Sequence, residues 1–176
     1  MQKALPKRYE LLIISISSPL MIGVYEEGRL IDKISSDLKT SEILLPLIKE
    51  CLDKYDISRI IYTRGPGSYM AIKLTYIMLK TIEIVQGIQC VGCSGFTLNG
   101  GEPIKAIGNL YFIKEKETII TKKYEQAINV KFTLPQSIQD LELDEESTPE
   151  YIPVSYTHLT LPTINGECGC GGGGGG

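Results

Sequence analysis

The segment Arg64-Gly65-Pro66-Gly67-Ser68 constrains the fold of this chain more than any other. It follows a β-branched and aromatic run, Arg59–Thr63, which is typical of a buried strand. Glycine allows backbone angles that other residues avoid, and proline fixes its own φ, so the segment predicts a tight turn. Ser68 stands at the N-cap position of a predicted helix, Tyr69–Val85, which should end at Gly87.

A strand–turn–helix junction leaves backbone amides free to bind an anion. This makes Gly65, Gly67 and Ser68 candidate contacts for a nucleotide or a phosphate group. The residues leave open the alternative of a tight connection without a ligand. The junction is not a Walker A loop, because its glycine spacing differs and Lys73 falls one turn inside the helix.

Composition narrows the class of protein. The 176 residues suit one domain or two small ones, and 43% of them are hydrophobic, which is enough for a packed core. The formal net charge of -3 argues against an autonomous nucleic-acid-binding protein. No apolar run approaches the ~20 residues that span a bilayer. The first residues lack the apolar centre of a signal peptide, so we expect a cytoplasmic protein.

The last residues are set aside before the fold is considered. Val154–Thr163 resembles one reading frame of a transposon-based sequencing adapter, and Gly171–Gly176 resembles a translated guanine homopolymer. We interpret 154–176 as a disordered tail from outside the gene and expect the protein's own sequence to end near Pro153. A glycine linker is the alternative. The interpretation removes the only histidine, His158, so no histidine-based or metal-based catalytic site is predicted.

The order of the predicted elements indicates an α/β fold with a mixed sheet. Three hairpin-linked strands come first, at 11–17, 21–25 and 29–35. They are followed by a helix capped by Thr40 or Ser41 and ending near Tyr55, a strand at 59–63, the helix at 69–85 and a short strand at 89–92. Hairpin-linked strands are antiparallel and helix-linked strands are parallel, so the sheet should be mixed, with helices covering it.

These elements make up a predicted N-terminal subdomain, residues 1–101. Residues 102–153 are predicted to form a short β-rich subdomain that packs on it, because about fifty residues are too few for a secure core of their own. Its strands are expected at 108–113 and 118–121, as a hairpin, and at 130–134. The acidic run Asp140–Glu146 is predicted to be a solvated loop or edge. Cys90-Val-Gly-Cys93 matches a redox motif, but its place at a strand end favours core packing.

Both helices are more apolar than contact with a single sheet requires. In the first, apolar residues come as doublets such as Leu47-Ile48, and the second is apolar nearly all round apart from Lys73, Lys80 and Glu83. A helix of this kind is usually buried on both sides. We therefore predict that its second side contacts another subunit. The alternative is that the C-terminal section of the chain covers it.

Five segments in order carry a resemblance to a known family. They are Ile14-Ser15-Ile16-Ser17-Ser18, Leu44-Leu45-Pro46-Leu47-Ile48, Gly65–Lys73, Val91-Gly92-Cys93-Ser94 and Pro149-Glu150-Tyr151. They resemble the TsaB (YeaZ) family, the dimerisation subunit of bacterial threonylcarbamoyladenosine tRNA modification. The most specific signature of that family is Gly-Pro-Gly-Ser-Phe-Thr-Gly-hydrophobic-Arg. The matching residues here are Gly65-Pro66-Gly67-Ser68-Tyr69-Met70-Ala71-Ile72-Lys73.

The resemblance implies an actin-like (ASKHA, ribonuclease-H-like) fold with a reduced C-terminal subdomain, in a subunit that is not itself an enzyme. Its partner would be the catalytic subunit TsaD, bound through the two apolar helices. The complex, with the ATPase TsaE, would transfer threonylcarbamoyl to the adenosine beside the anticodon of tRNA. The chain would contact tRNA only through the complex and would not contact a membrane. The expected partner contacts are Leu44, Leu45, Ile48, Ile72, Lys73 and Tyr76. No cofactor of its own is expected, while ATP or ADP at the subunit interface and a homodimer are left open.

The rival prediction is a nucleotide-dependent ATPase or phosphotransferase of the actin-like superfamily that uses the turn Gly65–Ser68. An actin-like ATPase needs a carboxylate in its first turn for a magnesium-bound nucleotide, and that position here is Ser15. Lys73 replaces an arginine of the family pattern and loses its bidentate geometry. The missing carboxylate favours the non-catalytic subunit.

Overall fold

A computed structural model describes residues 6–129 and 131–152 of the chain. The predicted tail, 154–176, lies outside the described residues. A five-stranded sheet has the order β3-β2-β1-β4-β5. Its strands are β1 (Tyr9–Ile14), β2 (Leu20–Glu26), β3 (Arg29–Ser36), β4 (Ile57–Gly65) and β5 (Gln89–Ser94). β1, β2 and β3 pair antiparallel, whereas β4 runs parallel to both β1 and β5. The predicted mixed sheet is confirmed.

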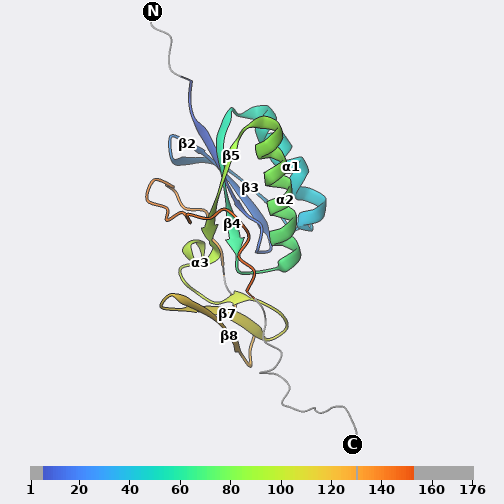
Figure 1. The fold of residues 1–176 in the computed structure, drawn as a ribbon, viewed down its shortest axis with the longest axis vertical. Helices are drawn as coiled ribbons and strands as arrows, with labels where there is room; N and C mark the ends of the chain where they lie inside the picture. The colour runs from blue at the N-terminus through green and yellow to red at the C-terminus, as the bar shows by residue number, and fades with distance from the viewer. Residues whose placement is uncertain (1–5, 130, 153–176) are drawn as a thin grey trace, which may run out of the picture.

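Two long helices cover one face of this sheet (Figure 1). They are α1 (Thr40–Lys54) and α2 (Tyr69–Gln86). Every second residue of β1 points toward them, so Leu11 and Ile13 join the core beneath the helices. The described helices include none that is long and apolar enough to span a bilayer.

The helix ends follow the predictions in part. Gly87 ends α2 in the left-handed conformation, with φ at 70°, as expected for a glycine in this position. The prediction that Thr40 or Ser41 caps α1 is wrong, because both lie inside the helix and the N-cap residue is Lys39. The α1 N-cap makes no side-chain hydrogen bond, since a lysine has no acceptor to offer the first amides.

The other face of the sheet is covered by a short helix, α3 (Gly95–Leu98), and by the C-terminal segment. Leu134 and Ile138 of this segment are buried against Leu12 and Ile14 of β1. Figure 1 shows the segment, in orange, on the side of the sheet away from α1 and α2. The predicted strand at 130–134 is wrong for residues 131–134, which pair with no strand. Leu134 packs on the face of the sheet instead of joining its edge. Val130 lies outside the described residues.

A separate antiparallel sheet has the order β6-β7-β8. Its strands are β6 (Ile104–Lys105), β7 (Leu110–Glu115) and β8 (Thr118–Lys123), and the predicted hairpin is the pair β7–β8. Phe112 and Ile104 of this sheet pack with Phe96 of α3. The division into 1–101 and 102–153 stays a prediction. The chain does return from the second sheet to the first one, where Leu134 and Ile138 are buried.

Neighbouring residues of α1 should differ sharply in their contribution to stability. Ile48 is fully buried beneath the helix, whereas half of the Leu45 side chain is exposed. We expect Ile48→Ala to lower the free energy of unfolding by about 2–5 kcal/mol, through lost burial and a cavity. Leu45→Ala should change it by no more than about 0.5 kcal/mol. Urea unfolding of the two variants measures the difference, and equal losses would contradict this placement of α1.

Candidate functional site

The junction predicted from the glycines and proline is present between β4 and α2. Ser68 is the N-cap of α2, and its Oγ accepts a hydrogen bond from the amide of Ala71 at 3.4 Å. Gly65 has φ at 130°, and a Cβ there would lie 2.6 Å from the carbonyl oxygen of Glu150. A Cβ on Gly67 would lie 2.9 Å from Cβ of Ile16. Close packing within the chain therefore explains both glycines without a ligand.

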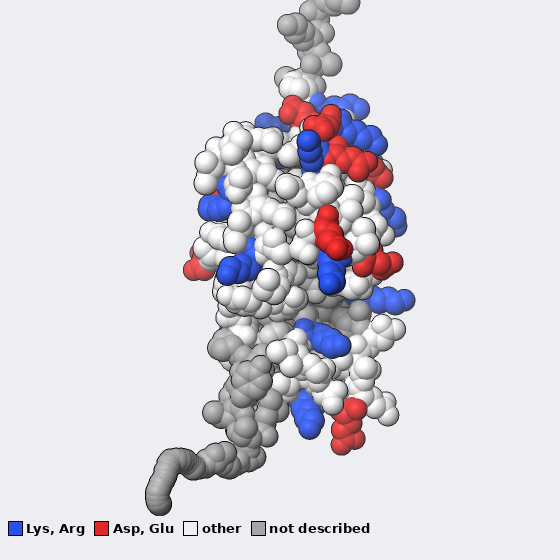
Figure 2. All heavy atoms as spheres, turned by 90° about the vertical axis from the view of Figure 1, so that its right-hand side faces the viewer, with Lys and Arg blue, Asp and Glu red and all other residues white. Residues whose placement is uncertain are grey.

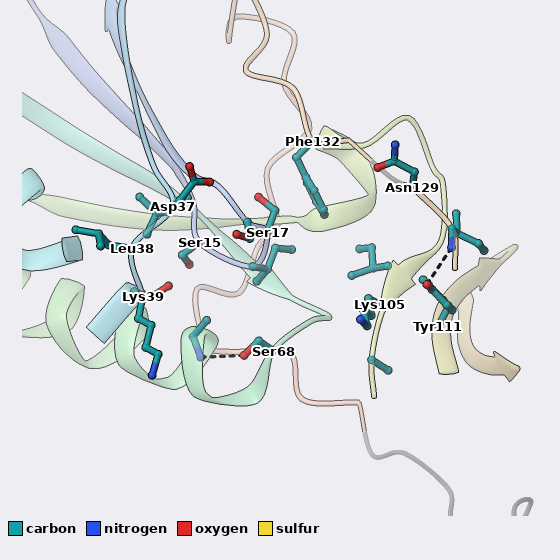
Figure 3. A pocket seen from close by; sticks show the side chains of 18 residues that line it. Ser15, Ser17, Asp37, Leu38, Lys39, Ser68, Lys105, Tyr111, Asn129 and Phe132 are labelled. Atoms are coloured by element: carbon teal, nitrogen blue, oxygen red, sulfur yellow. Dashed lines mark hydrogen bonds between the residues drawn. The ribbon is translucent and has the colours of Figure 1, made fainter. Parts of the chain in front are cut away.

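An open cleft of about 550 Å³ lies beside this junction. Figure 3 shows it between the end of the large sheet, with the first turns of α1 and α2, and the small sheet. Of the three candidate phosphate contacts, Ser68 lines the cleft, whereas Gly65 and Gly67 are not among its lining residues. The polar and charged lining includes Ser15, Ser17, Asp37, Lys39, Thr40, Ser68, Lys105 and Asn129.

The charged side chains that line the cleft in the described chain are two lysines and one aspartate. Lys39 and Lys105 stand on opposite walls, and Asp37 is the one carboxylate among the described lining residues. Ser15, which the motif resemblance aligns with the first-turn carboxylate of an actin-like ATPase, is buried and hydrogen-bonded to the Thr75 hydroxyl at 2.7 Å. Across residues 6–129 and 131–152, no group of three or more His, Cys, Asp or Glu side chains could hold a metal ion. The hydrogen bond between Ser15, which directly follows β1, and Thr75 of α2 joins these two elements.

The six residues predicted to contact a partner fall into two groups. Leu44, Ile48 and Ile72 are buried in the chain's own core, so they cannot present their side chains to another subunit. Their assignment as partner contacts is therefore wrong, because α1 and α2 turn these three residues toward the sheet. Leu45 and Lys73 are exposed, and Tyr76 is half-buried. For these three the partner contact stays a prediction.

An apolar stripe runs along the outer side of α2. It consists of Met70, Leu74, Ile77 and Ile84. Three of these residues, Met70, Ile77 and Ile84, are spaced seven residues apart, which is one heptad. Ile77 is 52% exposed and Ile84 is 79% exposed, whereas Leu74 is half-buried. Figure 2 faces this side of the molecule and shows a wide area with few charged side chains. The described C-terminal segment covers the opposite face of the sheet and leaves Ile77 and Ile84 exposed.

A tyrosine cluster, Tyr69, Tyr76 and Tyr151, lies at the N-terminal end of the stripe. The rings of Tyr69 and Tyr151 are 4.8 Å apart, and Nζ of Lys73 lies 5.9 Å from the Tyr69 ring. Burial, together with the phenols of Tyr69 and Tyr76, raises the pKa of Tyr151. The sequence predicts Tyr76 and Lys73 as partner contacts. It does not predict that Tyr151 of the Pro149-Glu150-Tyr151 motif lies against Tyr69.

Sequence reasoning also missed a charged cluster around Arg64. The Arg64 side chain is buried; its Nη1 lies 2.6 Å from Oδ2 of Asp144, and its Nη2 lies 3.5 Å from Oε2 of Glu146. The predicted solvated loop is therefore wrong for Asp144, whose side chain is only 27% exposed, whereas the Glu146 side chain is 77% exposed, as predicted. The available signal was Arg64 itself, because a charge at the end of a buried strand requires partners.

Glu150 adds a third carboxylate near Arg64. Its Oε1 is buried and has no hydrogen-bond partner among the described residues. Burial is the main cause that raises its pKa above the usual 4.5, and Asp144 adds to it, while Arg64 and Lys114 act in the opposite direction. The ionised form of Glu150 is therefore disfavoured in the folded chain.

Cys90 and Cys93 are buried, and burial raises the pKa of their thiols to about 11 and about 12. Both thiols are protonated at neutral pH, which favours core packing over redox chemistry.

The raised pKa of Glu150 should be visible in the dependence of stability on pH. The folded state binds this proton more tightly than the unfolded state, so stability falls as pH rises from the unfolded pKa, near 4.5, through the folded one. We expect Glu150→Gln to raise the melting temperature at pH 8 and to lose this advantage near pH 4. Thermal unfolding between these pH values measures the effect. Parallel curves for the variant and the parent chain would show that Glu150 is not held in this environment.

Comparison with known proteins gives the fold. No family model matches the chain, and no curated protein matches it. Two solved structures from Pseudomonas aeruginosa are similar in fold. YeaZ has a TM-score of 0.51 at 14% identity, over 73% of this chain and 65% of YeaZ. An uncharacterised protein with similarity to peptidase YeaZ has a TM-score of 0.53 at 13% identity, over 71% of this chain and 70% of that protein. The chain thus has the mixed-sheet, actin-like fold of the YeaZ structures.

Proposed function

We propose that the chain is a non-catalytic scaffold subunit of the TsaB type, which pairs with the catalytic subunit TsaD. The observation that carries the proposal is the apolar stripe on α2, exposed beside the tyrosine cluster. A row of large apolar side chains on a surface helix is costly in water and marks a site of protein contact. The YeaZ-like fold and the motif resemblance support TsaD as the partner.

The spacing of the stripe fits helix-on-helix packing. Side chains one heptad apart, as in Met70, Ile77 and Ile84, stay on the same line when two helices cross at about 20°. Leu74 fills the intermediate position. Leu45 on α1 offers a second exposed apolar contact. We therefore expect the partner to lay a helix along α2 and to bury the stripe.

The tyrosine cluster fits the same surface. Tyrosine is enriched among the residues that dominate binding energy, because its large ring loses little conformational entropy on ordering. Lys73, beside Tyr69, would give the partner one cation at the edge of an otherwise apolar contact. On this proposal the chain has no catalytic residues and acts by binding TsaD. TsaE would join the complex, and tRNA would contact the chain only through it.

A charge on the stripe should abolish the complex and leave the fold intact. Ile77→Glu places a carboxylate in the centre of the proposed contact, whereas Ile31→Glu changes a comparably exposed isoleucine, 46% against 52%, on β3. Co-expression with TsaD followed by size-exclusion chromatography with light scattering should give a one-to-one complex for the parent chain and for Ile31→Glu only. Unchanged melting temperatures provide the folding control. A stable complex with Ile77→Glu would overturn this surface.

The cleft supports a second candidate function, a nucleotide-dependent enzyme, through Lys39 and Lys105. Because Ser15 replaces the first-turn carboxylate, we expect the isolated chain to show no tight binding of Mg·ATP by calorimetry and no ATP hydrolysis. Tight binding that is lost in Lys39→Ala/Lys105→Ala would move the enzyme to first place. Binding of ATP or ADP only by the complex with TsaD would instead place a nucleotide at the subunit interface.

A further inference from the structure

The last described part of the chain forms a strap, residues 144–151, across the end of β4. The Asp144 amide donates to the Gly92 carbonyl, and the Glu150 amide donates to the Arg64 carbonyl, each at 2.9 Å. Between these two points, the Tyr62 hydroxyl donates to the carbonyl of Ser147. Hydrogen bonds to its backbone thus attach the strap at its start, middle and end.

Arg64 is the central anchor of the strap. Its Nε donates to the Thr148 carbonyl at 2.5 Å, while its two terminal nitrogens pair with Asp144 and Glu146. A planar guanidinium with several fixed donors suits such a set of acceptors, whereas a lysine offers one point charge. The alkyl part of Arg64 lies over Gly92, where any Cβ would collide with it. One buried side chain therefore holds three positions of the strap.

The strap ends on the surface proposed to bind the partner. The Tyr151 ring contacts the ring of Tyr69, the first residue of α2, with ring centres 4.8 Å apart and the ring planes tilted by 40°. Both rings remain about half exposed, Tyr69 at 55% and Tyr151 at 43%. Tyr151 thus belongs to the outer surface, and the contact extends the apolar stripe by one residue that comes from the strap.

We propose that the strap is part of the partner surface and that Arg64 is a positioning residue that sets Tyr151 on it. This inference rests on the proposed function. Holding both tyrosines in place before binding lowers the entropy cost of ordering them in the complex. Arg64 is too buried to contact the partner itself and acts through the strap.

The direct test compares two tyrosines that each pair with another tyrosine. Tyr151 pairs with Tyr69, and Tyr124 pairs with Tyr111 in the small sheet at 5.4 Å. We expect Tyr151→Ala to weaken binding of the partner subunit roughly tenfold or more, measured by calorimetry. Tyr124→Ala should leave the affinity unchanged. Equal affinities of both variants and the parent chain would overturn the role of the strap.

The role of Arg64 is tested by a double-mutant cycle. Arg64→Ala should weaken binding in the parent chain but add little to Tyr151→Ala, because both changes act through the same ring. Arg59→Ala, which breaks the Arg59–Glu10 pair at 2.5 Å, is the matched control for losing an ion pair. Additive losses from Arg64→Ala and Tyr151→Ala would overturn the positioning role. Arg64→Lys serves as the milder variant if Arg64→Ala fails to fold.

A measurement on the free chain separates this inference from the proposed function. Amide hydrogen exchange should rise in residues 144–151 of the Arg64 variant and stay unchanged in β1 and α2. Unchanged exchange in the strap would overturn the anchor. A parent chain that binds no TsaD overturns the proposed function and the strap's part in it. Binding that is sensitive to Ile77→Glu but not to Tyr151→Ala overturns the strap alone.

Discussion

The large sheet has two apolar faces, and the described chain has two long helices, both on the same face. This constraint governs the remaining structure. The second face must be covered by other means, and the chain does so with α3 and with the extended segment that buries Leu134 and Ile138. Because that segment is used on the far face, the stripe on α2 is left without cover by any of the described residues. The path of the C-terminal segment therefore explains both the burial of the far face of the sheet and the exposure of the stripe on α2.

The same segment connects the fold to the proposed function. After covering the far face, it crosses the end of β4, where Arg64 holds it, and reaches α2 through Tyr151. The proposed partner surface is thereby built from two distant parts of the chain, a helix that follows the Gly65–Ser68 turn and a strap that packs against that turn. Gly65 has no room for a side chain because the strap passes so close.

Local patterns predicted most of the elements, since β-branched runs, Ser68 and Gly87 act within a few residues of the structure they determine, but they misplaced the α1 cap and predicted a strand at 131–134 that the structure lacks. They could not decide which residue of an apolar doublet faces the sheet. Leu44 and Leu45 look alike in the sequence, yet one is buried and the other half exposed, because α1 packs on the sheet in one rotation. The contacts of Asp144 with Arg64 join residues 80 positions apart, and no local signal in the acidic run points to that partner. Ser15 does line the cleft, while Lys39 and Lys105, which are 66 positions apart in the sequence, reach its two walls only in the fold.

The distance along the chain between Arg64 and its acceptors also sets an order of assembly. Contacts that close long loops form late, after local helices and hairpins. During synthesis, α2 leaves the ribosome long before Asp144 and Tyr151, and until they follow, Arg64 has none of its strap acceptors. A nascent chain therefore presents a helix face without its final tyrosine. If the proposed function is correct, only a chain translated through the strap would offer the whole surface to the partner.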